Sequence, residues 1–103
     1  MRVIWHPQAK EVRDQIADYI SRQFGRTSKI QFLQEVRETT HLLKSNPSIG
    51  SIDPLFANRP KTYRSIIIQG LCKMVYYIDG DTIYIAAFWD TRREPNAQSA
   101  QVK

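Results

Sequence analysis

The sequence of 103 residues contains little cysteine and no long apolar run. Its one cysteine, Cys72, cannot form an internal disulfide and suits a small buried strand position. The Cys/His spacing typical of zinc sites is missing, so we expect neither a metal nor a cofactor. Signal-peptide and membrane-span patterns are also missing. These absences predict a soluble, cytoplasmic protein with no membrane partner.

Positive charge is in excess, with 15 Lys and Arg against 10 Asp and Glu. A net charge of +5 suits an anionic partner such as nucleic acid or an acidic peptide. The surplus is spread along the chain, so charge alone does not identify the partner. A hydrophobic content of 42% in a chain of this length predicts one folded domain. We place that domain at residues 1–95 and a polar tail at residues 96–103.

Three runs rich in Ile, Val, Tyr and Phe lie between Thr62 and Pro95 and predict an antiparallel meander. Gly70-Leu71 and Asp79-Gly80 separate the runs. Asp-Gly suits a two-residue type I′ turn, because both central residues of that turn need a positive φ. Side chains alternate along strands, so this turn predicts two different faces. The expected core face holds Cys72, Met74, Tyr76, Ile78, Ile83, Ile85, Ala87 and Trp89.

The second face of this hairpin is expected to be open, basic and aromatic. Arg64 comes from the preceding strand, and a two-residue loop at Gly70-Leu71 places it opposite Tyr77 on the open face. A loop longer or shorter by one residue would place Arg64 on the other face. The open face is predicted to hold Lys73, Val75, Tyr77, Thr82, Tyr84 and Phe88. We hypothesise that four basic residues converge there: Arg64, Lys73, Arg92 and Arg93.

The first half of the chain predicts a strand at residues 1–5 and a helical hairpin. Pro7 suits the first turn of a helix over residues 7–24, which ends at Gly25. Ser28 and Gln31 form a capping-box pattern for a second helix that ends at Asn46-Pro47. Its expected inner stripe is Ile30, Leu33, Val36, Thr40 and Leu43. The fold class is therefore α+β, with the hairpin packed on a four-stranded, mainly antiparallel sheet.

Residues 48–61 contain glycine, asparagine and two prolines and predict a long ordered loop. Loops of this length are uncommon unless they are functional. Burial of Leu55 and Phe56 is expected to hold the loop against the domain. Arg59 and Lys61 add positive charge beside the strand that starts near Tyr63.

Several short motifs occur in a fixed order along the chain. W-H-P-Q-A opens the first helix, I-A-D-Y-I lies near its end, and N-P-S-I-G follows the second helix. Y-R-S-I, K-M-V-Y-Y-I-D-G-D and F-W-D-T-R-R-E-P then mark the meander. In this combination, from Val3 to Pro95, the chain resembles the RelE/ParE superfamily of toxins from type II toxin–antitoxin modules, the plasmid stabilisation type.

The resemblance implies a toxin that is neutralised by a cognate antitoxin. RelE-like members cleave mRNA in the ribosomal A site, whereas ParE-like members poison DNA gyrase and are not nucleases. We favour the ribosome and mRNA as the target, because three basic positions match. DNA gyrase is the alternative, and a non-toxic binding or regulatory module on the same scaffold is the third possibility.

RNA cleavage by its own 2′-hydroxyl needs a base, an acid and positive charge over the phosphorane, but no metal. The resemblance assigns Arg64, Lys73 and Arg92 or Arg93 to basic positions of the family. Lys73 would transfer the proton, while Arg64 and Arg93 would hold phosphate, because a guanidinium is planar and stays charged. Four further residues are expected to contact nucleic acid, the tyrosines by stacking: Arg59, Lys61, Tyr77 and Tyr84.

Two departures from the nuclease pattern leave the target open. RelE-like members often carry a second basic residue where this chain has Ile66, and nothing after Trp89 supplies the usual Tyr or His. The general acid is therefore unassigned, which favours the ParE-like branch or a weak or altered nuclease, whereas Lys73 favours the nuclease. Structural interpretations also remain: Arg64 and Lys73 as solvated strand charges, Arg92-Arg93 as a charged strand exit, and the tyrosines as cross-strand packing.

Overall fold

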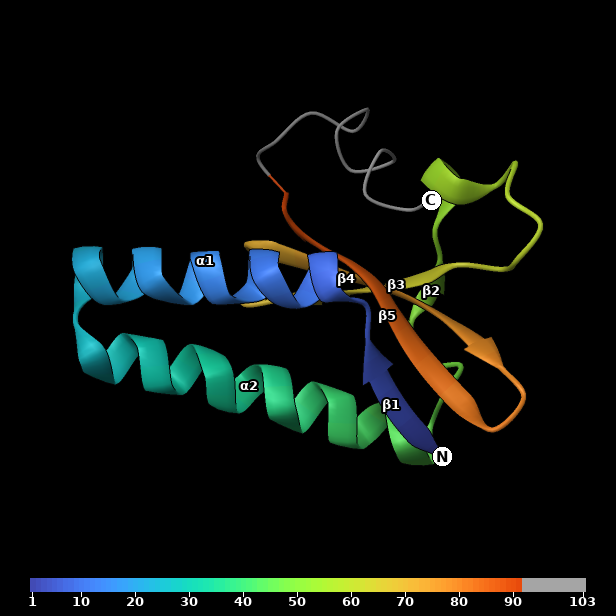
Figure 1. Ribbon diagram of the computed structural model, residues 1–103, viewed down its shortest axis with the longest axis horizontal. Coiled ribbons are helices and arrows are strands. Elements are labelled where there is room, and N and C mark those ends of the chain that lie inside the picture. The colour runs from blue at the N-terminus through green and yellow to red at the C-terminus, as the bar shows by residue number, and fades with distance from the viewer. Residues whose placement is uncertain (92–103) are drawn as a thin grey trace.

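The computed structural model describes residues 1–91 as a helical hairpin packed on a mixed sheet (Figure 1). The helices are α1 (Pro7–Phe24) and α2 (Arg26–Ser45), and a short 3-10 helix, η1 (Pro54–Phe56), follows them. The five strands are β1 (Arg2–Trp5), β2 (Ser51–Ile52), β3 (Arg64–Ile68), β4 (Cys72–Asp79) and β5 (Thr82–Asp90). The predicted α+β class is confirmed, with one more strand than expected.

The sheet has the order β1-β5-β4-β3-β2. β1 runs parallel to β5, and the other neighbouring strands are antiparallel. The additional strand is β2, whose two residues pair with the start of β3 inside the segment predicted to be a loop. A two-residue strand is too short to leave a periodic pattern in the sequence, which is why the sheet was expected to have four strands.

The helical hairpin has a link of one residue. Gly25 adopts φ +97° between the two helices, a conformation that suits glycine. α1 has the predicted bounds, but α2 begins at Arg26, and no side chain caps it. The capping-box prediction at Ser28 is therefore wrong, since Ser28 Oγ lies inside the helix and donates to the carbonyl of Phe24 at 3.4 Å. Local side-chain bonds of this kind compete with capping.

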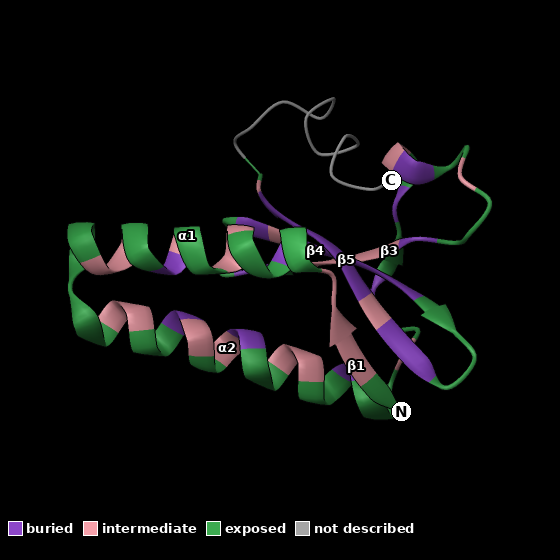
Figure 2. Cartoon of the chain, in the orientation of Figure 1, coloured by how far each residue is buried: buried purple, intermediate pink, exposed green. Residues whose placement is uncertain are grey.

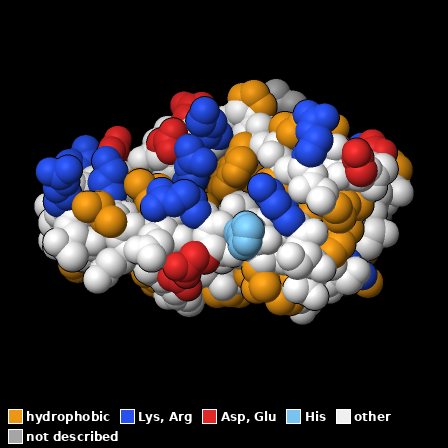
Figure 3. All heavy atoms as spheres, turned by 90° about the horizontal axis from the view of Figure 1, so that it is seen from below, with side chains coloured by type: hydrophobic (Ala, Val, Ile, Leu, Met, Phe, Trp, Pro, Cys, Tyr) orange, Lys and Arg blue, Asp and Glu red, His pale blue; other side chains and the backbone are white. Residues whose placement is uncertain are grey.

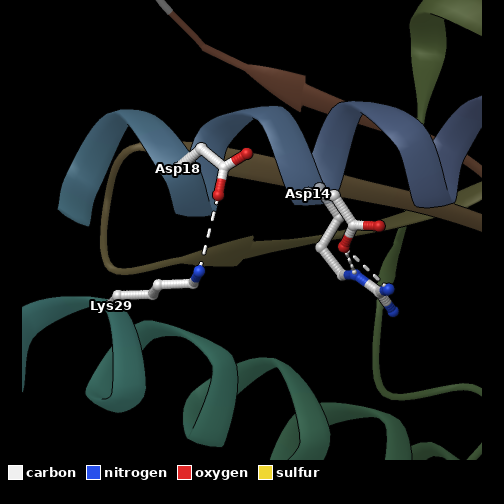
Figure 4. A network of polar contacts seen from close by, with 4 residues as sticks. Asp14, Asp18 and Lys29 are labelled. Carbon is white, nitrogen blue, oxygen red and sulfur yellow. Dashed lines mark hydrogen bonds and ion pairs between the residues drawn. The ribbon is translucent and has the colours of Figure 1, made fainter. Parts of the chain in front are cut away.

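The inner face of α2 differs in part from the predicted stripe. Val36 and Leu43 are buried as expected, but Phe32 is also buried and Ile30 is exposed. Figure 4 shows how the two helices face each other near their link, where Lys29 Nζ of α2 lies 3.4 Å from Asp18 Oδ1 of α1. Both side chains are solvated, so this ion pair contributes little to stability and the apolar contacts hold the hairpin together.

The β4–β5 hairpin has a different register from the predicted one. Its loop is Gly80-Asp81, so Ile78 pairs with Ile83 and Tyr77 with Tyr84. Gly80 has φ +63° and Asp81 does not have a positive φ, which is the pattern of a type II′ turn. Because the shift is even, the residues of β4 keep their predicted faces.

A β-bulge then reverses the faces at the end of β5. Tyr76 pairs with Ile85 and Val75 with Ala87, so Ala86 is the extra residue. Ala87 therefore lies on the face predicted to be open, and Phe88 lies in the helix-facing core. Trp89, which was predicted for the core face, pairs with Lys73.

The turn between β3 and β4 is one residue longer than predicted. Ile68 pairs with Cys72, and the Leu71 amide donates to the Ile68 carbonyl at 3.1 Å. Gln69 and Gly70 have φ +55° and +67°, which makes this the type I′ turn of the sheet. The added residue moves every side chain of β3 to the opposite face from the one predicted.

Both faces of the sheet are covered over part of their area (Figure 2). The main core lies between the hairpin and the sheet and includes Phe32, Met74, Tyr76 and Phe88. A second, smaller core lies on the opposite face under the segment between β2 and β3, with Phe56, Tyr63 and Tyr77 at its centre. The expected burial is confirmed for Phe56, and Leu55 is partly buried against the same second core.

Candidate functional site

Arg64 lies on the helix-facing side of the sheet. It pairs with Tyr76, whereas Lys73 pairs with Ile67 one position out of phase, so Arg64 and Lys73 lie on opposite faces. Arg64 Nη1 donates to the Gly50 carbonyl at 2.9 Å and approaches the Ser48 carbonyl at 3.5 Å. The prediction that Arg64 and Lys73 converge on one surface is therefore wrong, because the longer turn before β4 reversed the face of β3.

Tyr76, like Arg64, forms hydrogen bonds with the turn that follows α2. The Tyr76 hydroxyl donates to the Pro47 carbonyl at 2.7 Å and accepts from the Gly50 amide at 2.9 Å. Burial raises the pKa of Tyr76, and the Gly50 hydrogen bond and the Arg64 charge oppose that rise. A methyl group on Gly50 would lie 2.7 Å from the Tyr76 oxygen and 2.9 Å from the Ser65 carbonyl oxygen, so this position admits only glycine.

Lys73 is on the predicted face, but an acidic residue neutralises it there. Lys73 Nζ lies 2.9 Å from Asp53 Oδ2, and both side chains are largely withdrawn from solvent. The other carboxylate oxygen of Asp53 accepts from the Leu55 amide at 3.0 Å and caps η1. A buried charge that is paired and hydrogen-bonded in this way holds the segment to the sheet.

An aromatic cluster adjoins this ion pair on the same face. The Tyr77 ring stacks on Tyr84 with centroids 5.2 Å apart and meets the Tyr63 ring edge-on at 5.4 Å. Lys61 Nζ lies 4.2 Å from the centre of the Tyr77 ring, a cation–π contact. His6 Nε2 is 3.1 Å from the Tyr77 hydroxyl. The structure thus brings Lys61, Tyr77 and Tyr84 together on one face.

This cluster is largely internal packing. Only 8% of Tyr77 is exposed, and neighbouring rings occupy the positions where a base would stack. Tyr84 is half-buried, and Lys61 also lies 3.8 Å from Asp79 Oδ2 across exposed surface. Cross-strand packing beneath the covering segment therefore accounts for the tyrosines, and Lys61 supplies accessible charge at the edge of the cluster.

The remaining predicted site residues are placed as follows. The guanidinium carbon of Arg59 lies 5.8 Å from the Phe56 ring centre, at the surface of the second core. Arg92 and Arg93 lie outside the described residues, as does the predicted tail. Within residues 1–91, no group of three or more His, Cys, Asp or Glu side chains is arranged to hold a metal ion. In the same residues, neither helix is apolar enough over a sufficient length to cross a bilayer.

Three residues that sequence reasoning did not assign to this face take part in its contacts: Asp53, Tyr63 and His6. The Asp53-Pro54 pair does carry a local signal, because Asp followed by Pro is a common helix start. Nothing in the sequence connects His6 with Tyr77, since β1 is placed beside β5 only by a parallel pairing from a distant part of the chain.

A groove lies on the other side of the molecule, between α1 and the end of the sheet. It encloses about 580 Å³. Its lining is mainly apolar and aromatic, with Val12, Ile16, Tyr19 and Phe24 from α1 and Leu71 and Trp89 from the sheet. Tyr19 and Leu71 are about half exposed, so apolar surface is open to solvent along the groove. Exposed apolar surface of this kind is typical of an interaction site.

The architecture is a two-helix hairpin on one face of a small mixed sheet, with β1 parallel to β5. Residues 3–95 match the family described as the ParE toxin of the type II toxin–antitoxin system parDE, and the chain therefore belongs to that family.

One solved structure similar in fold comes from the chromosomal ParDE toxin–antitoxin system of P. aeruginosa. The TM-score is 0.69 at 18% sequence identity, and the alignment covers 87% of this chain and 95% of that chain. At this identity the likeness concerns the fold alone. None of the curated proteins matches the sequence significantly.

Proposed function

We propose that this protein arrests growth by poisoning DNA gyrase without enzymatic chemistry, and that a cognate antitoxin neutralises it. Family membership gives the toxin class. The observation that carries the choice of target is the separation of Arg64 and Lys73 on opposite faces of the sheet, each with structural partners. A site for RNA cleavage would need both charges over one phosphorane.

Ribosome-dependent mRNA cleavage is the second candidate function. The observation in its favour is the grouping of Lys61, Tyr77 and His6 on the face opposite the helices. Lysine, tyrosine and histidine can all transfer protons without a metal. In this version His6 takes the place of the missing C-terminal acid, and Lys61 supplies the positive charge that Arg64 cannot deliver to this face.

The antitoxin is the partner that the toxin class implies. The groove beside α1 suits a protein segment rather than a rigid substrate, because it is long, open and mainly apolar. From Val12 to Phe24 it follows three turns of α1, a length that can accept a helix or an extended strand. The cytoplasm is the proposed site of action, since gyrase and ribosomes are both found there.

Induced expression of the full chain tests the target. Under the gyrase proposal, a reporter plasmid loses supercoiling or is cleaved before protein synthesis falls. An immediate loss of translation with intact supercoiling would instead select the ribosome. If gyrase is the target, the Lys61→Ala and Tyr77→Phe variants should both stay toxic. If the protein is a nuclease, the same two variants should lose toxicity while keeping their fold. Unimpaired growth at good expression would contradict both proposals and leave the non-toxic binding module.

A further inference from the structure

The link between the two helices presents an aromatic side chain to solvent. Phe24, the last residue of α1, is 70% exposed, more than any other large hydrophobic residue in the part of the chain that the structure describes. The hairpin extends beyond the sheet, so its tip projects from the body of the molecule (Figure 1). We define the hairpin tip as residues 19–30. Phe24 also lines the groove, but the groove does not bury it.

The hairpin tip is also positively charged. It contains Arg22, Arg26 and Lys29 and no acidic residue, and the next acidic residue along α2 is Glu35. Lys29 is paired with Asp18, but neither Arg22 nor Arg26 forms an ion pair within residues 1–91. Figure 3 shows Lys and Arg side chains gathered at this end of the molecule, next to an apolar patch.

An exposed ring between two unpaired guanidinium groups combines the two contacts that hold a nucleic-acid strand. A ring can stack on any base, and guanidinium groups bind phosphate oxygens with directional hydrogen bonds. Covering the Phe24 ring would also remove from water the apolar surface that folding leaves exposed, which favours binding. We propose that the hairpin tip binds a nucleic-acid strand with accessible bases, with Phe24 stacking on a base and Arg22 and Arg26 contacting phosphates.

This surface lies apart from the face that carries Lys61, Tyr77 and Tyr84, so its binding does not depend on cleavage chemistry. It does adjoin the groove, because Phe24 belongs to both. A partner that fills the groove up to Phe24 would therefore cover part of the hairpin tip. Occupation of the groove and nucleic-acid binding at the tip should exclude each other.

Fluorescence anisotropy of the purified full chain with a short labelled oligothymidylate tests the charges. Arg22→Ala/Arg26→Ala is compared with Arg37→Ala/Lys44→Ala, which removes two exposed charges elsewhere on α2. The tip variant should bind more weakly than this control. The slope of the logarithm of its binding constant against the logarithm of salt concentration should fall in magnitude by about 1.4, since each phosphate contact on a single strand contributes about 0.7. Equal binding by the two double variants would overturn the proposal.

The ring has its own test. Phe24→Ala should weaken oligothymidylate binding at least about fivefold, the lower end for loss of one base stack. Ile52→Ala, which shortens another exposed apolar side chain, should bind like the wild type. Thermal melting of all variants checks the fold. Unchanged binding by Phe24→Ala, or tighter binding to the matching duplex than to the single strand, would overturn the stacking role.

Discussion

At the scale of single residues, the Tyr76 hydroxyl contributes to the stability of the fold even though its neighbours are apolar. One oxygen serves the Pro47 carbonyl and the Gly50 amide, so two backbone groups of one turn depend on it. We expect Tyr76→Phe to lower the free energy of unfolding by about 1–3 kcal/mol, because both groups lose their partner. Chemical denaturation measures the change. Tyr19→Phe, at a half-exposed position, is the control and should stay within about 0.5 kcal/mol of the wild type.

The same residue gives stability a dependence on pH. Burial raises the pKa of Tyr76 above its ordinary value, so the folded state keeps this proton at a pH where the unfolded state loses it. The contribution is fully present below the unfolded pKa of about 10 and declines as pH rises from there through the folded pKa. Denaturation of the wild type and Tyr76→Phe should therefore show a stability difference that shrinks above about pH 10. A constant difference would contradict this assignment.

Lys73 and Asp53 form a pair in which each charge needs the other. Lys73→Met leaves the Asp53 carboxylate buried without a counter-ion and should cost about 3–5 kcal/mol of unfolding free energy. Asp53→Asn keeps an oxygen for the Leu55 amide but removes the charge. In a double-mutant cycle the combined variant should lose less than the sum of the single variants. Additive losses, or a stable but non-toxic Lys73→Met, would favour the proton-transfer role predicted from sequence.

At the scale of elements, two turns decide the register of the sheet. In the β3–β4 turn, Gln69 adopts φ +55°, a conformation that costs a non-glycine residue about 1–2 kcal/mol. Gln69→Asn creates the Asn-Gly pair preferred in type I′ turns and should raise the free energy of unfolding by up to about 1 kcal/mol. Gly70→Ala is the counterpart: its methyl group would meet open space, so backbone strain alone should lower stability.

The two long helices, β1 and the three strands of the meander could be predicted from sequence, but β2 and the register of the sheet could not. Pro7 and Gly25 marked the ends of α1, and the β-branched and aromatic runs marked the meander. The glycine at each of the two turns suggested a loop of two residues. Such a loop can combine the glycine with the residue before it or with the residue after it, and both choices satisfy the preference of turns for glycine. No local sequence pattern marks the bulge at Ala86, because the bulge depends on the twist and packing of the assembled sheet.

The candidate site depended on that register. The basic residues of the candidate site could be identified from the sequence, but their faces could not. One added residue in the β3–β4 turn, at Gln69, places Arg64 on the helix-facing side. The shared face of Tyr77 and Tyr84 was less sensitive, because the even shift of the β4–β5 hairpin leaves both side chains on that face, whereas Lys61 comes from the segment before β3. Contacts between distant segments, such as Asp53 with Lys73 and His6 with Tyr77, need the whole fold and leave no pattern in the sequence.

At the scale of the whole molecule, the two faces of the sheet differ in what remains open. One face is partly closed by the segment between β2 and β3, and the other is covered by a hairpin that leaves an apolar groove beside α1. Burying a protein segment in this groove would remove apolar surface from water, a gain that grows with the area covered. The groove is therefore the surface through which neutralisation by the antitoxin is expected to act.

Leu71 tests this role because it lines the groove and is 45% exposed, so a polar residue fits there without disturbing the core. Leu71→Glu should stay toxic but escape neutralisation when the antitoxin is co-expressed, because a carboxylate in an apolar interface loses its hydration without gaining a partner. Ile52→Glu places the same charge at an exposed position outside the groove and should remain neutralised. Growth curves and co-purification with the antitoxin measure both effects. A Leu71→Glu toxin that is still bound and silenced would move the antitoxin to another surface, and the aromatic face around Tyr84 would then be the next to test.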